Sequence, residues 1–292
     1  MRTLVHLSDI HFGRVDEQLL APLRSTIEAV QPHVVVVSGD LTQRARSEQF
    51  KAARAWLDTL PGPQIVVPGN HDIPLYNVAA RFLSPLTKYR KYITENLAPE
   101  YVDDEIAVMG LNTARSLTIK DGRVNREQVQ RLQDRMAKVD ATLTRIVVTH
   151  HPFDLPEAFN EDDLVDRAPM AMEAFSKCGV DLLLAGHLHA SHSGNSARRY
   201  KIAGYAALVV QAGTATSTRG RGETNSFNVL RIDREEIQVE RYSWQDEKGA
   251  FEVATIEVFR RDGNTWQPLG TTPDMPEAIT SDETVALPTV SG

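Results

Sequence analysis

Cysteine is almost absent from this chain. The 292 residues contain one cysteine, Cys178. A single cysteine excludes a disulfide within the chain, and it excludes a zinc site built from several thiolates. A metal site in this protein would therefore depend on oxygen and imidazole ligands.

Long apolar runs and an excess of positive charge are also missing. No segment approaches the ~20 consecutive apolar residues of a transmembrane helix, and the N-terminal residues lack the apolar stretch and cleavage site of a signal peptide. The formal net charge is −7, so the overall field does not attract nucleic acid. We expect a cytoplasmic protein with no integral membrane segment and no nucleic-acid partner.

Short apolar runs alternate with amphipathic patterns along the first two thirds of the chain, which predicts an α/β domain. Four consecutive valines at 34–37 indicate a strand buried on both faces. The segment 74–96 has a helical pattern that Pro85 should interrupt. Further strands are expected at 3–7, 65–67, 106–111, 145–149 and 181–184, and helices at 17–30, 47–60 and 125–139.

The pattern changes after Gly204. Apolar runs at 207–211, 227–232, 237–244 and 253–259 follow one another without long helices, which predicts antiparallel pairing and a second sheet. From about Arg261 the chain is rich in Pro, Thr, Asp and Gly. We therefore predict a catalytic domain at residues 1–260 and an extended or disordered tail at 261–292.

Five polar motifs each follow an apolar run. Loops gather into a site at strand ends of an α/β sheet, and residues two apart in an extended segment point the same way. Each motif alone has an ordinary structural explanation, such as a turn or a solvated pair, but their joint occurrence favours a site. They are Asp9-Ile10-His11, Gly39-Asp40, Gly69-Asn70-His71-Asp72, His150 within Val-Val-Thr-His-His-Pro, and Gly186-His187-Leu188-His189.

These motifs supply carboxylate, imidazole and amide oxygen without thiolate. Such ligands suit Mn, Fe or Zn, with Mg or Co as further options. A carboxylate can bridge two cations, and Asp40 is the candidate bridge. The sequence thus predicts a metal centre with more than one ion.

The motifs resemble those of the calcineurin-like metallophosphoesterase superfamily. The resemblance covers roughly residues 3–215, and it implies a four-layer αββα sandwich of two mixed β-sheets flanked by helices, with a small helical cap at about 74–104. It implies one metal bound by Asp9, His11, Asp40 and His189, and a second bound by Asp40, Asn70, His150 and His187. His151 is the alternative to His150, and the first histidine after the strand is preferred by similarity. The resemblance also implies that a homodimer is possible.

Two such cations would acidify a bridging water, and the resulting hydroxide would attack phosphorus. His71 is the candidate general acid, because histidine titrates near neutral pH and Asn70 anchors its loop. Asp72 completes the predicted catalytic pair, orienting a histidine or holding the turn.

The substrate is predicted to be a small phosphate ester. The residues around Asp9 and Asn70 are similar to bacterial class III cyclic nucleotide phosphodiesterases and glycerophosphodiesterases. Tyr76 and Arg81 in the cap, and Asn112 and Arg115 after another strand, are candidate substrate-binding residues. The alternatives are hydrolysis of a UDP-diacylglucosamine-type pyrophosphate, a broad phosphomonoesterase, a nuclease, and a non-catalytic metal-binding scaffold.

Overall fold

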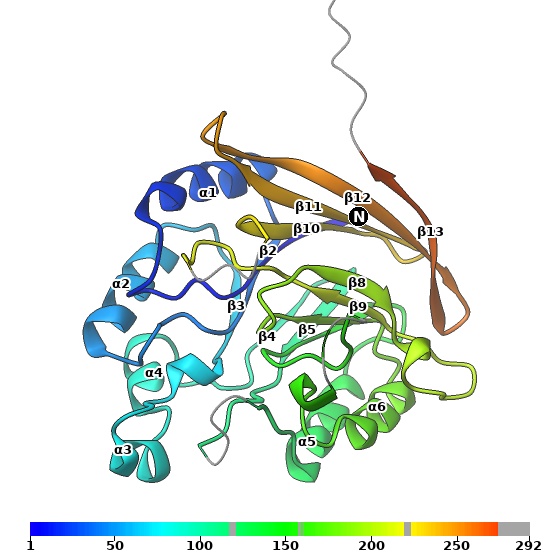
Figure 1. Ribbon diagram of the computed structural model, residues 1–292. Coiled ribbons are helices and arrows are strands. Elements are labelled where there is room, and N and C mark those ends of the chain that lie inside the picture. The colour runs from blue at the N-terminus through cyan, green and yellow to red at the C-terminus, as the bar shows by residue number, and fades with distance from the viewer. Residues whose placement is uncertain (117–120, 157–158, 160, 219–222, 274–292) are drawn as a thin grey trace, which may run out of the picture.

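A computed structural model describes residues 1–116, 121–156, 159, 161–218 and 223–273 of the chain. They form two stacked β-sheets between two layers of helices (Figure 1). The first sheet has the order β13-β12-β11-β10-β1-β2-β3. Its strands are β1 (Arg2–Leu7), β2 (Val34–Ser38), β3 (Gln64–Val67), β10 (Ser226–Ile232), β11 (Glu236–Gln245), β12 (Ala250–Asp262) and β13 (Thr265–Pro273).

The second sheet has the order β4-β5-β6-β7-β9-β8. Its strands are β4 (Glu100–Val102), β5 (Ile106–Gly110), β6 (Thr144–Val148), β7 (Leu182–Ala185), β8 (His192–Asn195) and β9 (Leu208–Gln211). The α-helices are α1 (Glu17–Val30), α2 (Ser47–Leu57), α3 (Val78–Leu83), α4 (Thr87–Tyr92), α5 (Arg126–Met136) and α6 (Ala168–Lys177). Short 3₁₀ helices are η1 (Asn70–Asp72), η2 (Glu161–Asp163) and η3 (Ser196–Arg198). Among the described residues, no helix combines the length and apolar character needed to cross a membrane.

Three apolar cores confirm the predicted four-layer αββα sandwich. One core lies between the first sheet and helices α1, α2 and α4, and a second lies between the other sheet and helices α5 and α6. The third joins the inner faces of the two sheets. Strand β2 shows how the sequence produces this arrangement: Val34 and Val36 face the inter-sheet core, while Val35 and Val37 face the helices. A strand with both faces covered needs a continuous apolar run.

The predicted assignment of the late strands to a second sheet is wrong. Strands β10 to β13 are antiparallel as expected, but β10 pairs with β1 and extends the first sheet. Strand β9 instead pairs in parallel with β7 of the second sheet. The local apolar pattern indicates that a strand is buried, but it does not specify which free edge the strand joins. Both sheets are consequently mixed.

The predicted start of the tail at Arg261 is also wrong. Strand β12 continues to Asp262, and β13 pairs with it antiparallel. Trp266 is 1% exposed and packs in the inter-sheet core, with the Arg261 guanidinium 4.7 Å from its ring centroid. One large buried side chain thus anchors a segment whose average composition is polar. Residues 274–292 of the predicted tail lie outside the described residues.

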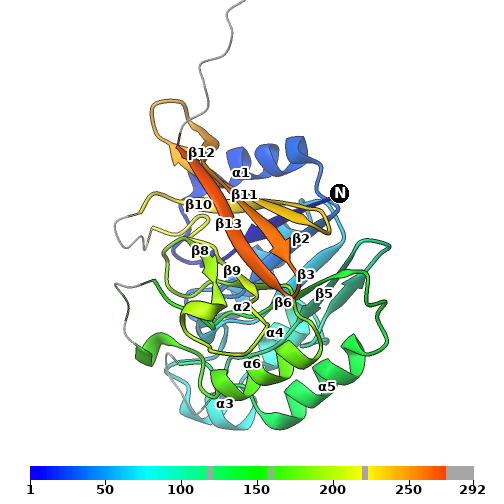
Figure 2. The same ribbon diagram turned by 90° about the vertical axis from the view of Figure 1, so that its right-hand side faces the viewer.

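Strand β13 also ties the two sheets together at one side of the sandwich, where it runs across the face turned to the viewer in Figure 2. The Trp266 amide donates to the Ala206 carbonyl at 3.1 Å, just before β9 of the other sheet. Trp266→Ala should lower the free energy of unfolding by about 3–5 kcal/mol, because it leaves a large cavity. Urea unfolding measures this, with the half-exposed Leu269→Ala on the same strand as control. A loss below about 1 kcal/mol would show that β13 contributes little to stability.

The predicted cap at 74–104 is helical only in part. Helices α3 and α4 are separated around Pro85 as expected, but Glu100–Val102 forms β4 at the edge of the second sheet. Helix α4 is part of the fold itself, because Tyr89 is fully buried and its hydroxyl donates to the Val66 carbonyl at 3.0 Å. Helix α3 lies outside α4, at the lower left of the molecule in Figure 1.

Candidate metal centre

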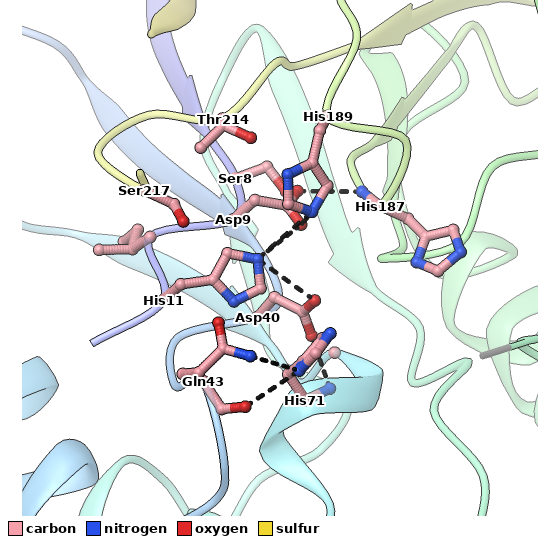
Figure 3. A network of polar contacts seen from close by, with 12 residues as sticks. Ser8, Asp9, His11, Asp40, Gln43, His71, His187, His189, Thr214 and Ser217 are labelled. Carbon is pink, nitrogen blue, oxygen red and sulfur yellow. Dashed lines mark hydrogen bonds and ion pairs between the residues drawn. The ribbon is translucent and has the colours of Figure 1, made fainter. Parts of the chain in front are cut away.

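The predicted ligands converge where the chain leaves the strands of both sheets. Figure 3 shows Asp9, His11, Asp40, His71 and His189, which come from the loops after β1, β2 and β7 and from η1, gathered in one region, with the His187 ring to one side. All seven predicted ligands are in these loops, in η1 or in the loop after β6: Asp9, His11, Asp40, Asn70, His150, His187 and His189.

The first group of donor atoms comes from Asp9, His11, Asp40 and His189. Asp9 Oδ1 lies 3.5 Å from His11 Nε2 and 3.3 Å from His189 Nε2. The two imidazole Nε2 atoms are 3.4 Å apart. Asp40 Oδ2 lies 3.8 Å from His11 Nε2. Donor atoms of Asp9, His11 and His189 therefore converge on one point, and Asp40 approaches this group on the side of His11.

The second group contains the remaining predicted ligands and again Asp40. Asn70 Oδ1 lies 3.0 Å from His150 Nε2 and 3.1 Å from His187 Nδ1. These two nitrogens are 3.3 Å apart. Asp40 Oδ2 is 3.5 Å from His150 Nε2. The same carboxylate oxygen thus faces both groups, as a bridging ligand must.

The spacing of these atoms fits metal ions. Ligand atoms about 2.1 Å from one ion, at angles between octahedral and tetrahedral values, lie roughly 3.0–3.4 Å apart. Asp9 Oδ1 is fully buried and has no hydrogen-bond partner among the described residues, although Oδ2 accepts from Ser8 Oγ at 2.6 Å and from the His187 amide at 3.0 Å. A buried carboxylate oxygen without a donor is costly, and a cation would compensate it. The residues present therefore fit a two-metal centre.

The backbone is strained at five of the seven predicted ligands. Asp9, His11, Asp40, His187 and His189 have φ between 53° and 73°. Non-glycine residues adopt this left-handed region rarely, and such strain concentrates at functional sites. The fold thus holds unfavourable conformations that direct these side chains inward.

Two glycines allow the ligand loops to approach closely. A Cβ at Gly69 would lie 2.1 Å from Asp40 Oδ1, and a Cβ at Gly186 would lie 1.7 Å from Ser8 Oγ. Any side chain at either position would displace a ligand or its hydrogen-bond partner. The glycines of these two motifs are therefore required by the packing of the site.

Burial and charge oppose each other in this centre. Burial alone would raise the pKa of Asp9 and Asp40, but the surrounding histidines, chiefly His189 and His150, hold both well below their ordinary value. Burial lowers the pKa of His150, whereas the charge and hydrogen bond of Asp40 raise it, to about 9 in total. The carboxylates therefore remain ionised, as metal ligands must be.

The structure distinguishes the two adjacent histidines. His150 Nδ1 donates to the Ser38 carbonyl at 2.7 Å, which directs Nε2 toward Asp40 and Asn70. His151 instead bonds Thr113 Oγ1 through Nδ1 at 2.8 Å, and its ring packs 4.6 Å from that of His187. Fixing the second ring nitrogen is typical of ligand histidines. This geometry favours His150 as the ligand.

His71 lies at the edge of the first group. Its ring centroid is 5.0 Å from that of His11, and its amide donates to Asp40 Oδ1 at 2.8 Å. Its Nδ1 lies 3.0 Å from the Gln43 carbonyl, which can only accept, and this contact is closer than the 3.4 Å to the Gln43 side-chain amide nitrogen, so we assign the proton to Nδ1. Nε2 is then the nitrogen that can exchange a proton with a substrate.

Asp72 holds the loops together. Its carboxylate accepts hydrogen bonds from the amides of Leu41, Thr42 and Gly69 at 3.0–3.2 Å, and from Thr42 Oγ1 at 3.0 Å. These donors join the loop after β2 to the loop after β3. This geometry supports the predicted role of Asp72 in holding the turn. It does not place the Asp72 carboxylate beside the reacting atoms.

Three of the four predicted substrate-binding residues meet at the loop 112–116, where the two arginines bind carbonyl groups of the protein. Arg81 is 5% exposed and donates to the Ser116 and Pro74 carbonyls. Arg115 donates to the Asn112 and Ala114 carbonyls and to Gln128, while Asn112 Oδ1 accepts from the Ala114 amide. Both guanidinium groups thus bind carbonyl oxygens of the protein. Tyr76 alone is widely exposed, at 77%.

Sequence reasoning missed Gln43 and Ser38, whose carbonyls orient His71 and His150. Gln43 also places its amide nitrogen 3.4 Å from His71 Nδ1, and its side chain is 6% exposed (Figure 3). Nothing in the local sequence marks either contact, because each joins segments at least 28 residues apart. In the sequence, the one indication of a role for Ser38 and Gln43 is that both lie close to Asp40 along the chain.

The chain resembles known phosphodiesterases in sequence. It is 35% identical to the glycerophosphodiester phosphodiesterase GpdQ of Enterobacter lignolyticus, over 24% of this chain and 29% of that protein. It is 24% identical to a probable cyclic nucleotide phosphodiesterase of Synechococcus, over 64% and 73% of the two chains. The cyclic AMP phosphodiesterase CpdA of Escherichia coli is 22% identical over 64% of this chain and 69% of that protein. The first match thus spans less than a third of its relative.

Solved structures share the fold at low identity. A purple acid phosphatase from yellow lupin superposes with a TM-score of 0.65 at 14% identity, over 89% of this chain and 54% of that one. A dimetal phosphatase from Danio rerio gives 0.60 at 14% identity, over 82% and 95%. The sequence profile of the calcineurin-like phosphoesterases matches residues 2–191. With both donor groups in place along that stretch, the chain belongs to the calcineurin-like phosphoesterase family.

Proposed function

We propose that this protein is a two-metal phosphodiesterase that hydrolyses a small phosphodiester. One observation carries the proposal: Asp40 Oδ2 faces donor atoms of both groups, at 3.8 Å from His11 Nε2 and 3.5 Å from His150 Nε2. Two bound cations, with Mn, Fe or Zn suited to these ligands, would activate water and polarise the phosphoryl oxygens. Asp9, His11 and His189 would hold one ion, and Asn70, His150 and His187 the other, with Asp40 between them.

Hydrolysis adds the hydroxyl of water to phosphorus and breaks the bond to one ester oxygen, which needs a proton. His71 is placed to donate it from Nε2 when the ring is doubly protonated, because the Nδ1 proton is held by the Gln43 carbonyl. The hydrogen bond from the His71 amide to Asp40 Oδ1 fixes the backbone of His71 beside the donor atoms. A carboxylate that serves the centre thus also positions the acid.

The functions of the relatives support a diester substrate. Those matched here are a glycerophosphodiester phosphodiesterase and two cyclic nucleotide phosphodiesterases. We propose cyclic nucleotides and glycerophosphodiesters as the first substrates to test.

A substrate panel tests the proposal directly. Protein treated with a chelator should be inactive, and Mn²⁺ should restore hydrolysis of bis-p-nitrophenyl phosphate. The panel should then span cyclic nucleotides, glycerophosphodiesters, nucleotide sugars and phosphomonoesters, with kcat/KM highest for a diester. Hydrolysis no faster than with Mn²⁺ alone would contradict an enzymatic role, and a clear preference for monoesters would contradict the diester assignment.

A further inference from the structure

Apolar side chains are exposed on the segment around α3. Tyr76, Val78, Phe82 and Leu83 are 77%, 63%, 52% and 85% exposed. Only three other large apolar residues in the described part of the chain are exposed, and they are scattered. A group of exposed apolar residues marks an interaction site. We call these four residues the 76–83 face.

The 76–83 face is attached to loops of the proposed active site. It begins four residues after Asp72, and Arg81 of α3 donates to the Ser116 carbonyl at 2.8 Å and to Pro74 at 3.2 Å. Ser116 is in the loop after β5, which also contains Thr113, and Thr113 bonds His151 beside the second group. Figure 1 shows α3 outside α4, at the lower left of the molecule. Helix α3 is therefore anchored by a buried arginine and leaves its apolar side chains exposed.

A positive charge lies against this face. The Arg44 guanidinium is 5.1 Å from the ring centroid of Tyr76. Arg44 directly follows Gln43, whose carbonyl bonds His71. His71 is thus linked through Gln43 and the adjacent Arg44 to Tyr76, and the apolar side chains of α3 follow Tyr76 along the chain. This order of charge and apolar surface complements an amphiphile with a phosphate at one end.

We propose that the 76–83 face binds the apolar part of an amphiphilic phosphodiester, on the side of the leaving group. The inference rests on the proposed function, because the leaving-group side is defined by His71 as the proposed proton donor. A second copy of the chain fits less well. Four side chains offer on the order of 500 Å², below the roughly 800 Å² per partner of a standard interface. Continuity with the catalytic loops favours the substrate.

The test uses methyl 4-alkylphenyl phosphates with methyl, butyl or octyl chains, below micelle-forming concentrations and with Mn²⁺. Their leaving phenols have nearly equal pKa values, so chain length changes apolar contact alone. A buried methylene strengthens binding up to about fourfold. We expect kcat/KM to rise at least about tenfold from the methyl to the octyl ester. The F82S/L83S variant should lose that rise.

Leu269→Ser is the matched control, because Leu269 is also 52% exposed but lies on β13. It should keep the full chain-length dependence. Hydrolysis of the methyl ester without any gain for octyl in the wild-type protein would overturn the inference and leave the proposed function intact. Failure to hydrolyse any ester, including bis-p-nitrophenyl phosphate, would overturn both. A dimer in light scattering that F82S/L83S converts to monomer would assign the face to a second copy instead.

Discussion

Asp40→Asn is expected to lower kcat/KM for bis-p-nitrophenyl phosphate by at least about 10³-fold. Asparagine keeps the size of the side chain and an oxygen that can accept from the His71 amide. It removes the negative charge that faces both donor groups at 3.5–3.8 Å. Two metals supply several kcal/mol of transition-state stabilisation, and each 1.36 kcal/mol is a factor of ten. Elemental analysis should find less than two metal equivalents in the purified variant.

The matched control for this substitution is Asp181→Asn. Asp181 is also a buried carboxylate, at 8% exposure, but it bonds Arg261 and the Arg145 amide, away from the donor groups. It should retain both metals and the wild-type kcat/KM, even if its stability falls. Two bound metals and normal turnover in Asp40→Asn would exclude Asp40 as the bridging ligand.

The fold could be predicted where a local pattern has only one structural solution. The valine run of β2 requires burial on both faces, and Pro85 interrupts the helical pattern of the cap segment. Strand order was not accessible in this way, because β10 joins β1 through pairing over more than 200 residues of chain. Trp266 illustrates the same limit: its burial depends on Ala206 and the inter-sheet core.

The site could be predicted for residues whose chemistry is specific. Carboxylate and imidazole side chains at strand ends have few other uses when they occur together, so their motifs predicted a metal centre, and the resemblance to the calcineurin-like superfamily implied the division into two groups. The residues that orient them act through main-chain carbonyls, as Ser38 and Gln43 do. Every residue has a main-chain carbonyl, so the identity of a residue does not indicate whether its carbonyl orients a histidine of the site. For the same reason Arg81 and Arg115, which look suited to phosphate, could not be recognised as partners of carbonyl groups.

His71→Ala should reduce kcat/KM by about 10²–10⁴-fold for a dialkyl phosphate, the usual contribution of general acid catalysis. An alkoxide leaves poorly without a proton, and His71 Nε2 is the proposed source. The loss should be much smaller for bis-p-nitrophenyl phosphate, because p-nitrophenolate departs without protonation. Measurements over a series of aryl leaving groups should therefore give a steeper dependence of rate on leaving-group pKa in the variant.

This dependence separates proton donation from a structural role for His71. Loss of the ring could also disturb the first donor group, since it packs 5.0 Å from His11, but weakened metal binding would lower activity on every substrate by a similar factor. Metal content should stay at two equivalents. His33→Ala, an exposed histidine whose Nδ1 accepts from the Thr3 amide at 3.1 Å, should leave the leaving-group dependence unchanged. Equal losses on alkyl and aryl esters in His71→Ala would remove His71 as the acid, while the two-metal assignment through Asp40 would stand on its own test.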